Sequence, residues 1–185
     1  MGIQIYGFGL IMTGITMTIF YLGFYYFWKE TYLNNKPIPA LSKIQQKIRI
    51  YDGTAIGSVI VRTILILMPW NNWGSSPTYY YSVFSFRILT NLPLYVIGME
   101  VLYLFYISTK SADIVSQVPK NITFALKNCV IWIIVSYATY TITLFGVPVM
   151  PILGMMMIPK TIAYLIVLYY MYRYIMMNSL TNSPK

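Results

Sequence analysis

The sequence of 185 residues has no histidine and a single cysteine, Cys129. The lack of histidine removes the commonest general base, the commonest metal ligand and an axial ligand that many haem proteins use. One cysteine cannot form a disulfide within the chain. Aspartate and glutamate together number four, which argues against a carboxylate-rich metal site. We therefore expect no catalytic residues, no metal site and no cofactor.

Charge is also scarce, because charged residues make up only 9% of the chain while hydrophobic residues make up 58%. Such a chain has too little polar surface to cover a core in water, and lipid is the solvent that suits it. The composition predicts an all-α integral membrane protein. It is rich in Ile, Tyr, Asn, Lys and Met, and we expect its location to be a prokaryotic cell membrane or the inner mitochondrial membrane.

Long apolar runs divide the chain into membrane-spanning segments. Each run is long enough to cross a hydrocarbon core of about 30 Å as a helix. Proline inside a run bends a span without excluding it, because neighbouring helices satisfy the freed carbonyl groups. We expect a bundle of five transmembrane helices in a single domain, 1–185, with spans near residues 3–28, 53–70, 82–108, 122–147 and 152–177.

The basic residues lie in alternate gaps between these runs. The gaps 71–81 and 148–151 hold none, whereas the other gaps and the C-terminal end hold most of the 13 Lys and Arg residues. Loops rich in Lys and Arg stay on the cytoplasmic, or inner, side of a membrane. Five spans place every basic gap on one side, so the pattern predicts an outer N-terminus and an inner C-terminus.

The first basic gap has a helical pattern of its own. After Pro37 and Pro39, apolar residues recur at helical spacing, and the basic residues face elsewhere. This pattern predicts a short amphipathic helix near residues 38–51, lying on the inner membrane surface. It would sense lipid, dock a partner or simply connect two spans. The residues that we expect to contact lipid there are Lys43, Lys47 and Arg49.

The net charge of +9 favours one class of partner over another. Binding to nucleic acid needs a continuous basic face, but these basic residues lie at the edges of the apolar runs. Such a distribution favours contact with anionic lipid headgroups. We therefore expect anionic lipids as partners and no nucleic acid.

Arg62 and Glu100 are ionisable residues inside consecutive spans. Ionisable groups at membrane depth are costly and are usually paired or functional. Arg62 lies nine residues after Gly53 and Glu100 lies eight residues before Ser108, which places both about 12–13 Å from the inner side. We expect an ion pair between them. Its role would be to fix the register of two helices or to relay a proton through Glu100.

Arg87 and Lys160 fall in the outer half of their spans. Together with Trp70 and Trp73 they could line a basic crevice that holds an anionic lipid, a quinone headgroup or a carboxylate of a partner. The alternative is that both cations extend to the phosphates of the outer leaflet. The sequence leaves these two interpretations open.

These features favour a non-catalytic subunit of a larger membrane assembly, such as a respiratory or other energy-converting complex. One reason is the lack of recognisable catalytic or metal-binding residues. The other is the presence of features suited to contact with other membrane subunits, among them the small-residue motif Gly53-Thr54-Ala55-Ile56-Gly57. The alternative is a small transporter or channel for protons, ions or an anionic solute that uses Glu100 with Arg62. A membrane enzyme is the third possibility, although no acid–base or nucleophile cluster supports it.

Overall fold

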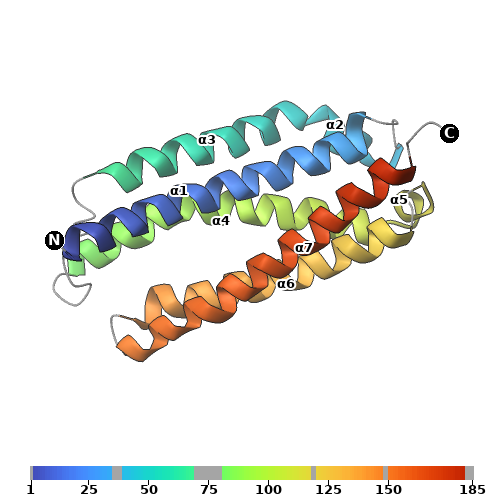
Figure 1. The fold of residues 1–185 in the computed structure, drawn as a ribbon. Coiled ribbons are helices and arrows are strands. Elements are labelled where there is room, and N and C mark those ends of the chain that lie inside the picture. Colours follow the sequence, from blue (N-terminus) through green and yellow to red (C-terminus); the bar gives the residue numbers. More distant parts are fainter. Residues whose placement is uncertain (1, 35–38, 69–80, 118–119, 148–149, 182–185) are drawn as a thin grey trace. The chain divides into compact units, whose positions relative to one another are not determined.

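Helices account for almost all of the computed structural model, which describes residues 2–34, 39–68, 81–117, 120–147 and 150–181 (Figure 1). The five long helices are α1 (Gly2–Lys29), α3 (Ile48–Leu67), α4 (Tyr81–Lys110), α6 (Lys120–Gly146) and α7 (Met157–Thr181). The short elements are η1 (Glu30–Asn34), η2 (Pro39–Leu41), α2 (Ser42–Gln46), α5 (Ala112–Gln117) and η4 (Pro151–Met156). The all-α character expected from the composition is confirmed.

Five helices in the described residues are long and apolar enough to cross a membrane. These segments are Ile11–Leu33, Ile48–Leu67, Ile88–Lys110, Lys120–Gly146 and Ile152–Arg173. Each overlaps one of the expected spans, and their boundaries differ by a few residues up to about eight. The structure is therefore compatible with an integral membrane protein of five spans.

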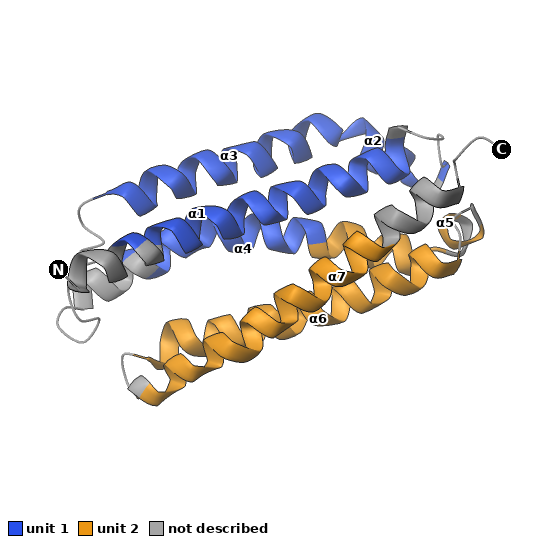
Figure 2. Ribbon diagram, in the orientation of Figure 1, with its two compact units in different colours: residues 1–101 blue, residues 102–185 orange. Residues whose placement is uncertain are grey.

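The chain divides into two compact units, unit 1 (Met1–Val101) and unit 2 (Leu102–Lys185) (Figure 2). The boundary falls inside α4, which continues through it as one helix. A single domain, 1–185, is what we expect from the sequence. The division lies within an apolar run, directly after Glu100 and Val101.

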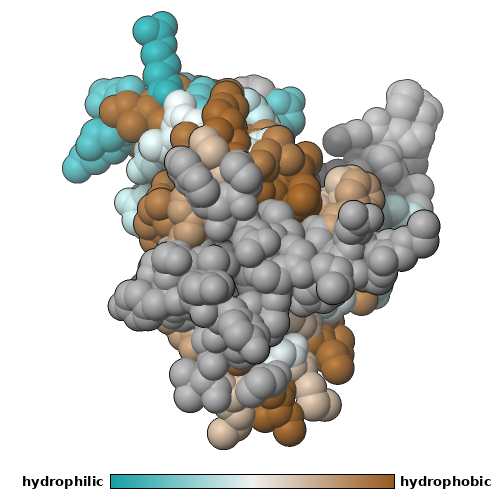
Figure 3. Space-filling model, turned by 90° about the vertical axis from the view of Figure 1, so that its left-hand side faces the viewer, coloured by the Kyte–Doolittle hydropathy of each residue, from teal (hydrophilic) through white to brown (hydrophobic). Residues whose placement is uncertain are grey.

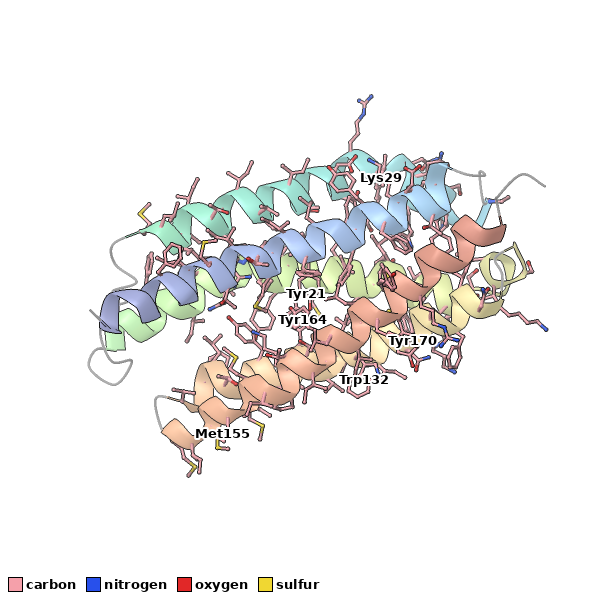
Figure 4. All side chains as sticks on the ribbon, viewed as in Figure 1. Tyr21, Lys29, Trp132, Met155, Tyr164 and Tyr170 are labelled. Carbon is pink, nitrogen blue, oxygen red and sulfur yellow. The ribbon has the colours of Figure 1, made fainter. Side chains whose placement is uncertain are left out.

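In unit 1, helices α1 and α3 pack along each other in antiparallel orientation. Three contacts define this register. Gly14 lies against Ile66, Thr18 meets Arg62, and Lys29 meets Asp52. Figure 4 labels Lys29, the last residue of α1. The face that α1 buries follows helical spacing and is mostly aromatic, with Tyr21, Phe24, Tyr25 and Trp28 all at most 5% exposed.

In unit 2, α6 packs against α7, again in opposite directions. The rings of Phe124 and Tyr170 lie 6.5 Å apart between centroids near one end of the pair, and Lys160 lies over Tyr140 farther along. Pro159 is the third residue of α7, in the first turn of an α-helix, where proline is tolerated.

Large apolar side chains remain on the surface of the long helices. Ile50, Leu67, Phe124 and Leu165 are between 59% and 65% exposed. In the view of Figure 3, hydrophobic side chains cover much of the described surface. A surface of this kind would be unfavourable in water and suits contact with lipid tails.

The helix expected at residues 38–51 is divided in the structure. The structure has the five-residue helix α2, and a break at Lys47 separates it from α3, which already begins at Ile48. Residues 48–51 therefore belong to the spanning helix. Leu41 and Ile44 are buried, and Ile38 lies outside the described residues.

Candidate functional site

A buried arginine joins the three long helices of unit 1. Arg62 on α3 is 2% exposed. Its Nη1 donates a hydrogen bond of 3.0 Å to Thr18 Oγ1 on α1, and its Nη2 donates one of 3.0 Å to Asn91 Oδ1 on α4. Hydrogen bonds to a charged group contribute about 1.5–3 kcal/mol each. We call Arg62, Thr18 and Asn91 the arginine cluster, and it fixes α1, α3 and α4 at one level.

The local structure of α1 prepares the acceptor for Arg62. The Thr18 hydroxyl donates to the Gly14 carbonyl at 3.0 Å, so its lone pairs stay available to the guanidinium. Gly14 itself permits the close approach of α3. A Cβ atom added there would lie 2.8 Å from Ile66 Cδ1 and 3.9 Å from Arg62 Nη2.

A second polar cluster lies toward the end of unit 1 that carries the basic residues, here called the basic end. Lys29 Nζ contacts both carboxylate oxygens of Asp52, at 2.7 and 2.8 Å, and Tyr25 donates its hydroxyl to Asp52 at 2.9 Å. The side chains of Lys29 and Asp52 are each about one quarter exposed. Their ion pair joins the end of α1 to the start of α3.

Glu100 on α4 completes this cluster. Its Oε2 lies 2.7 Å from Thr54 Oγ1 on α3, and the same hydroxyl lies 3.0 Å from the Tyr51 carbonyl oxygen. Glu100 Oε1 is buried and has no hydrogen-bond partner in the structure. Asp52 is close enough to interact electrostatically with Glu100. We call Lys29, Tyr25, Asp52, Thr54 and Glu100 the carboxylate cluster.

The ion pair expected between Arg62 and Glu100 is replaced by these two separate clusters. Arg62 contacts Asn91, nine residues before Glu100, and Glu100 contacts Thr54, eight residues before Arg62. At about 1.5 Å per residue, this difference in register amounts to about 13 Å along the helices.

The expected pairing places Arg62 and Glu100 at equal depth, counted from the inner ends of their apolar runs. Equal depth would follow only if the inner ends of the two spans lay at the same level. In the structure α4 continues for ten residues beyond Glu100 to Lys110, whereas α3 begins only six residues before Thr54. The helices therefore extend unequally past the level at which Thr54 and Glu100 meet.

Lys160 in unit 2 is buried instead of extended to a surface. It is 4% exposed, and its Nζ lies 3.9 Å from the centroid of the Tyr140 ring and 3.8 Å from Met157 Sδ. A desolvated ammonium over an aromatic face gains about 2 kcal/mol from the quadrupole of the ring. Lys160 thus links α7 to α6.

The other residues of the expected basic crevice are not placed. Trp70 and Trp73 lie outside the described residues, and Arg87 lies in α4 with its side chain outside the description. The residues expected to contact lipid lie within the described part of the chain. Lys43, Lys47 and Arg49 are all exposed on α2, the break after it and the start of α3.

Sequence reasoning missed the partners of these charged groups, namely Thr18, Asn91, Thr54 and Tyr140. Each is a polar or amphipathic residue inside an apolar run, which is the signal that could have drawn attention to it. For Tyr140 this signal is weak, because nineteen tyrosines are spread through the chain.

Among the described residues, no group of three His, Cys, Asp or Glu side chains could hold a metal ion. The fold and these clusters define a helical protein with five helices suited to spanning a membrane and with charged groups inside them. No known family model, curated protein or solved structure matches the chain.

Proposed function

We propose that this chain is a non-catalytic, multi-spanning subunit of a larger membrane protein assembly, with its N-terminus outside and its C-terminus inside. The type of assembly that we propose, a respiratory or other energy-converting complex, follows from the sequence argument alone. The same holds for the membrane, which would be that of a prokaryotic cell or the inner mitochondrial membrane.

The observation that carries the proposal is the arginine cluster. A guanidinium with 2% exposure donates to one neutral side chain on each of two neighbouring helices. That arrangement holds α1, α3 and α4 in register. Lys160 on Tyr140 has a comparable role in unit 2. Buried cations used in this way support a structural role.

One face of α3 offers a surface for another subunit. A Cβ atom added at Gly53 or at Gly57 would meet nothing within 4 Å in the described chain. Ile60 and Ile64 continue this face and are 54% and 51% exposed. Small residues four apart allow two helices to approach closely in lipid. We propose that a helix of a partner subunit packs on this face.

Purification of the native complex in mild detergent tests this proposal. We expect defined partner subunits to co-purify with the wild-type chain and to be lost in the Gly57→Leu variant. Gly23→Leu is the matched control. Gly23 on α1 also has open space around it, but large residues lie four positions away on either side. A wild-type chain that is monodisperse alone, without partners, would refute the proposal.

Anionic lipids are the second class of partner that we propose. Lys43, Lys47 and Arg49 are exposed near the basic end of unit 1. Each Lys or Arg near a negatively charged membrane surface contributes about 1 kcal/mol of attraction. These residues would hold the inner end of unit 1 at the headgroups.

The alternative function is a small transporter of protons or other ions. One observation favours it, namely the buried Glu100 Oε1 without a hydrogen-bond partner. Glu100 would act with Thr54 in this function, since Arg62 has other partners. Proton flux into liposomes that contain only this chain would support transport, and tight liposomes would exclude it.

A further inference from the structure

We propose that the Glu100 carboxyl group is a reversible proton-binding site, and that rotation of the Thr54 hydroxyl accommodates the gain or loss of the proton. This inference does not depend on the assembly role proposed above. It also supplies the titratable group that the alternative function would require.

The first argument comes from the hydrogen-bond geometry around Thr54. The hydroxyl has one hydrogen but two acceptors within reach, Glu100 Oε2 at 2.7 Å and the Tyr51 carbonyl at 3.0 Å. It can donate to only one of them at a time. Which of the two oxygens accepts the Thr54 hydrogen depends on whether Glu100 is protonated.

Two complete arrangements follow. When Glu100 is ionised, the Thr54 hydroxyl donates to Glu100 Oε2. When a proton from solvent binds Oε2, the new O–H group donates to Thr54 Oγ1, and the Thr54 hydroxyl hydrogen turns to the Tyr51 carbonyl. The net change is one added proton and the loss of one negative charge. No heavy atom has to move, because both contacts are already within hydrogen-bond distance.

The second argument comes from the other carboxyl oxygen. Glu100 Oε1 is buried and accepts no hydrogen bond. In the ionised group this oxygen would share the negative charge without solvation, which is costly in an apolar environment. In the protonated group it is a neutral carbonyl oxygen, and burial costs much less. The surroundings of Oε1 therefore favour the neutral, protonated form of Glu100 over the ionised form.

The charged and titratable groups around Glu100 come from α1, α3 and α4. Asp52 on α3 carries a carboxylate that acts on Glu100 electrostatically, and Tyr25 on α1 presents its hydroxyl to Asp52. Lys29 on α1 is held by both oxygens of Asp52, so its charge is already directed to that carboxylate. On α4 itself, Tyr103 is one turn away and is 49% exposed.

The same cluster lies close to the basic end of unit 1. Lys29 and Asp52 are partly exposed, and Asp52 lies two residues before Thr54 on α3. Thr54 is itself exposed and lies six residues, or about 9 Å, from the start of α3. If the basic end lies at the inner membrane surface, as proposed above, protons would reach Glu100 from that end without crossing the apolar length of the helices.

Infrared difference spectroscopy of the full chain in lipid tests the proposal. A protonated carboxyl group has a carbonyl stretching band that shifts to lower frequency in heavy water, and an ionised one lacks this band. We expect a band that appears when the pH is lowered and disappears reversibly when the pH is raised. Glu100→Gln should remove it. Glu30→Gln should keep it, since Glu30 is the other glutamate of the chain and is exposed.

A second pair of variants tests the role of the hydroxyl and does not require Glu100 to be changed. Thr54→Val removes the hydroxyl that contacts the carboxyl group and should move the carbonyl band to higher frequency. Thr54→Ser keeps a hydroxyl at the same position and should leave the band where it is in the wild type. A carbonyl band that does not respond to Thr54→Val would overturn the proposed hydroxyl switch.

Three results would overturn the proton site itself. They are the absence of any carboxyl band at all pH values, a band that Glu100→Gln leaves intact, and a band that does not change with pH. None of them depends on partner subunits or on flux. Failure of this inference is therefore distinguishable from failure of the proposed assembly role.

Discussion

At the scale of single residues, the protein shows how a charged group is accommodated among apolar helices. Arg62 and Lys160 use different means. The first donates to a hydroxyl and an amide oxygen, and the second lies on an aromatic ring. In both cases the partner belongs to another helix, so solvating the charge also holds helices together.

This account of Arg62 predicts that Thr18→Val destabilises the protein. The substitution removes the hydroxyl that accepts from Nη1 and leaves part of a buried guanidinium without an acceptor, which costs about 1–3 kcal/mol. The free energy of unfolding in detergent micelles measures the effect. Thr16→Val is the control, because Thr16 is exposed and its hydroxyl bonds only to the Met12 carbonyl. Equal effects of the two substitutions would contradict the role of Thr18.

At the scale of elements, the packing of α1 on α3 depends on one glycine. Ile66 is 1% exposed and lies against Gly14, directly beside the arginine cluster. The same surface contact sets the distance between the two helix axes and the position of the guanidinium. Gly14 therefore matters for the space that it leaves, and not for backbone flexibility.

We predict that Gly14→Leu lowers the free energy of unfolding by about 1–3 kcal/mol, because the new side chain overlaps buried Ile66. Gly23→Leu on the same helix should be neutral or slightly stabilising, since it enters open space and replaces a poor helix former. Thermal unfolding in detergent compares the two variants. If Gly23→Leu were the more harmful change, the packing of α1 on α3 described here would be refuted.

At the scale of the whole molecule, the alternation of basic and uncharged gaps makes a prediction about orientation. The gap that contains Ser75 has no basic residue, whereas the gap that contains Ser42 has several. Lys and Arg in short loops remain on the inner side of the membrane. The five spans should therefore place these two serines on opposite sides.

Cysteine labelling tests this orientation. In a chain with Cys129→Ser, a membrane-impermeant thiol reagent added to intact cells should label Ser75→Cys and should not label Ser42→Cys. Permeabilising the cells should allow the reagent to label Ser42→Cys. The reverse result would place the N-terminus inside and would overturn the topology that we propose.

The sequence alone was sufficient for the helical class, the positions of the apolar helices and the identity of the charged residues inside them. Apolar runs of adequate length must form helices in lipid, because every backbone group needs an internal partner there. Arg62, Glu100 and Lys160 stand out inside these runs because ionisable residues are rare at such positions. None of this depends on how the helices pack.

The tertiary structure decided which groups meet. Apolar residues surround each spanning helix on most sides, because lipid tails are as apolar as a protein core, and so the pattern indicates neither the buried face nor the register. The register of α3 against α4 depends on how far each helix extends past the level of Thr54 and Glu100. It also depends on contacts between α1 and α3, such as that of Gly14 with Ile66. These contacts give Arg62 the partners Thr18 and Asn91, and they bring Glu100 to Thr54.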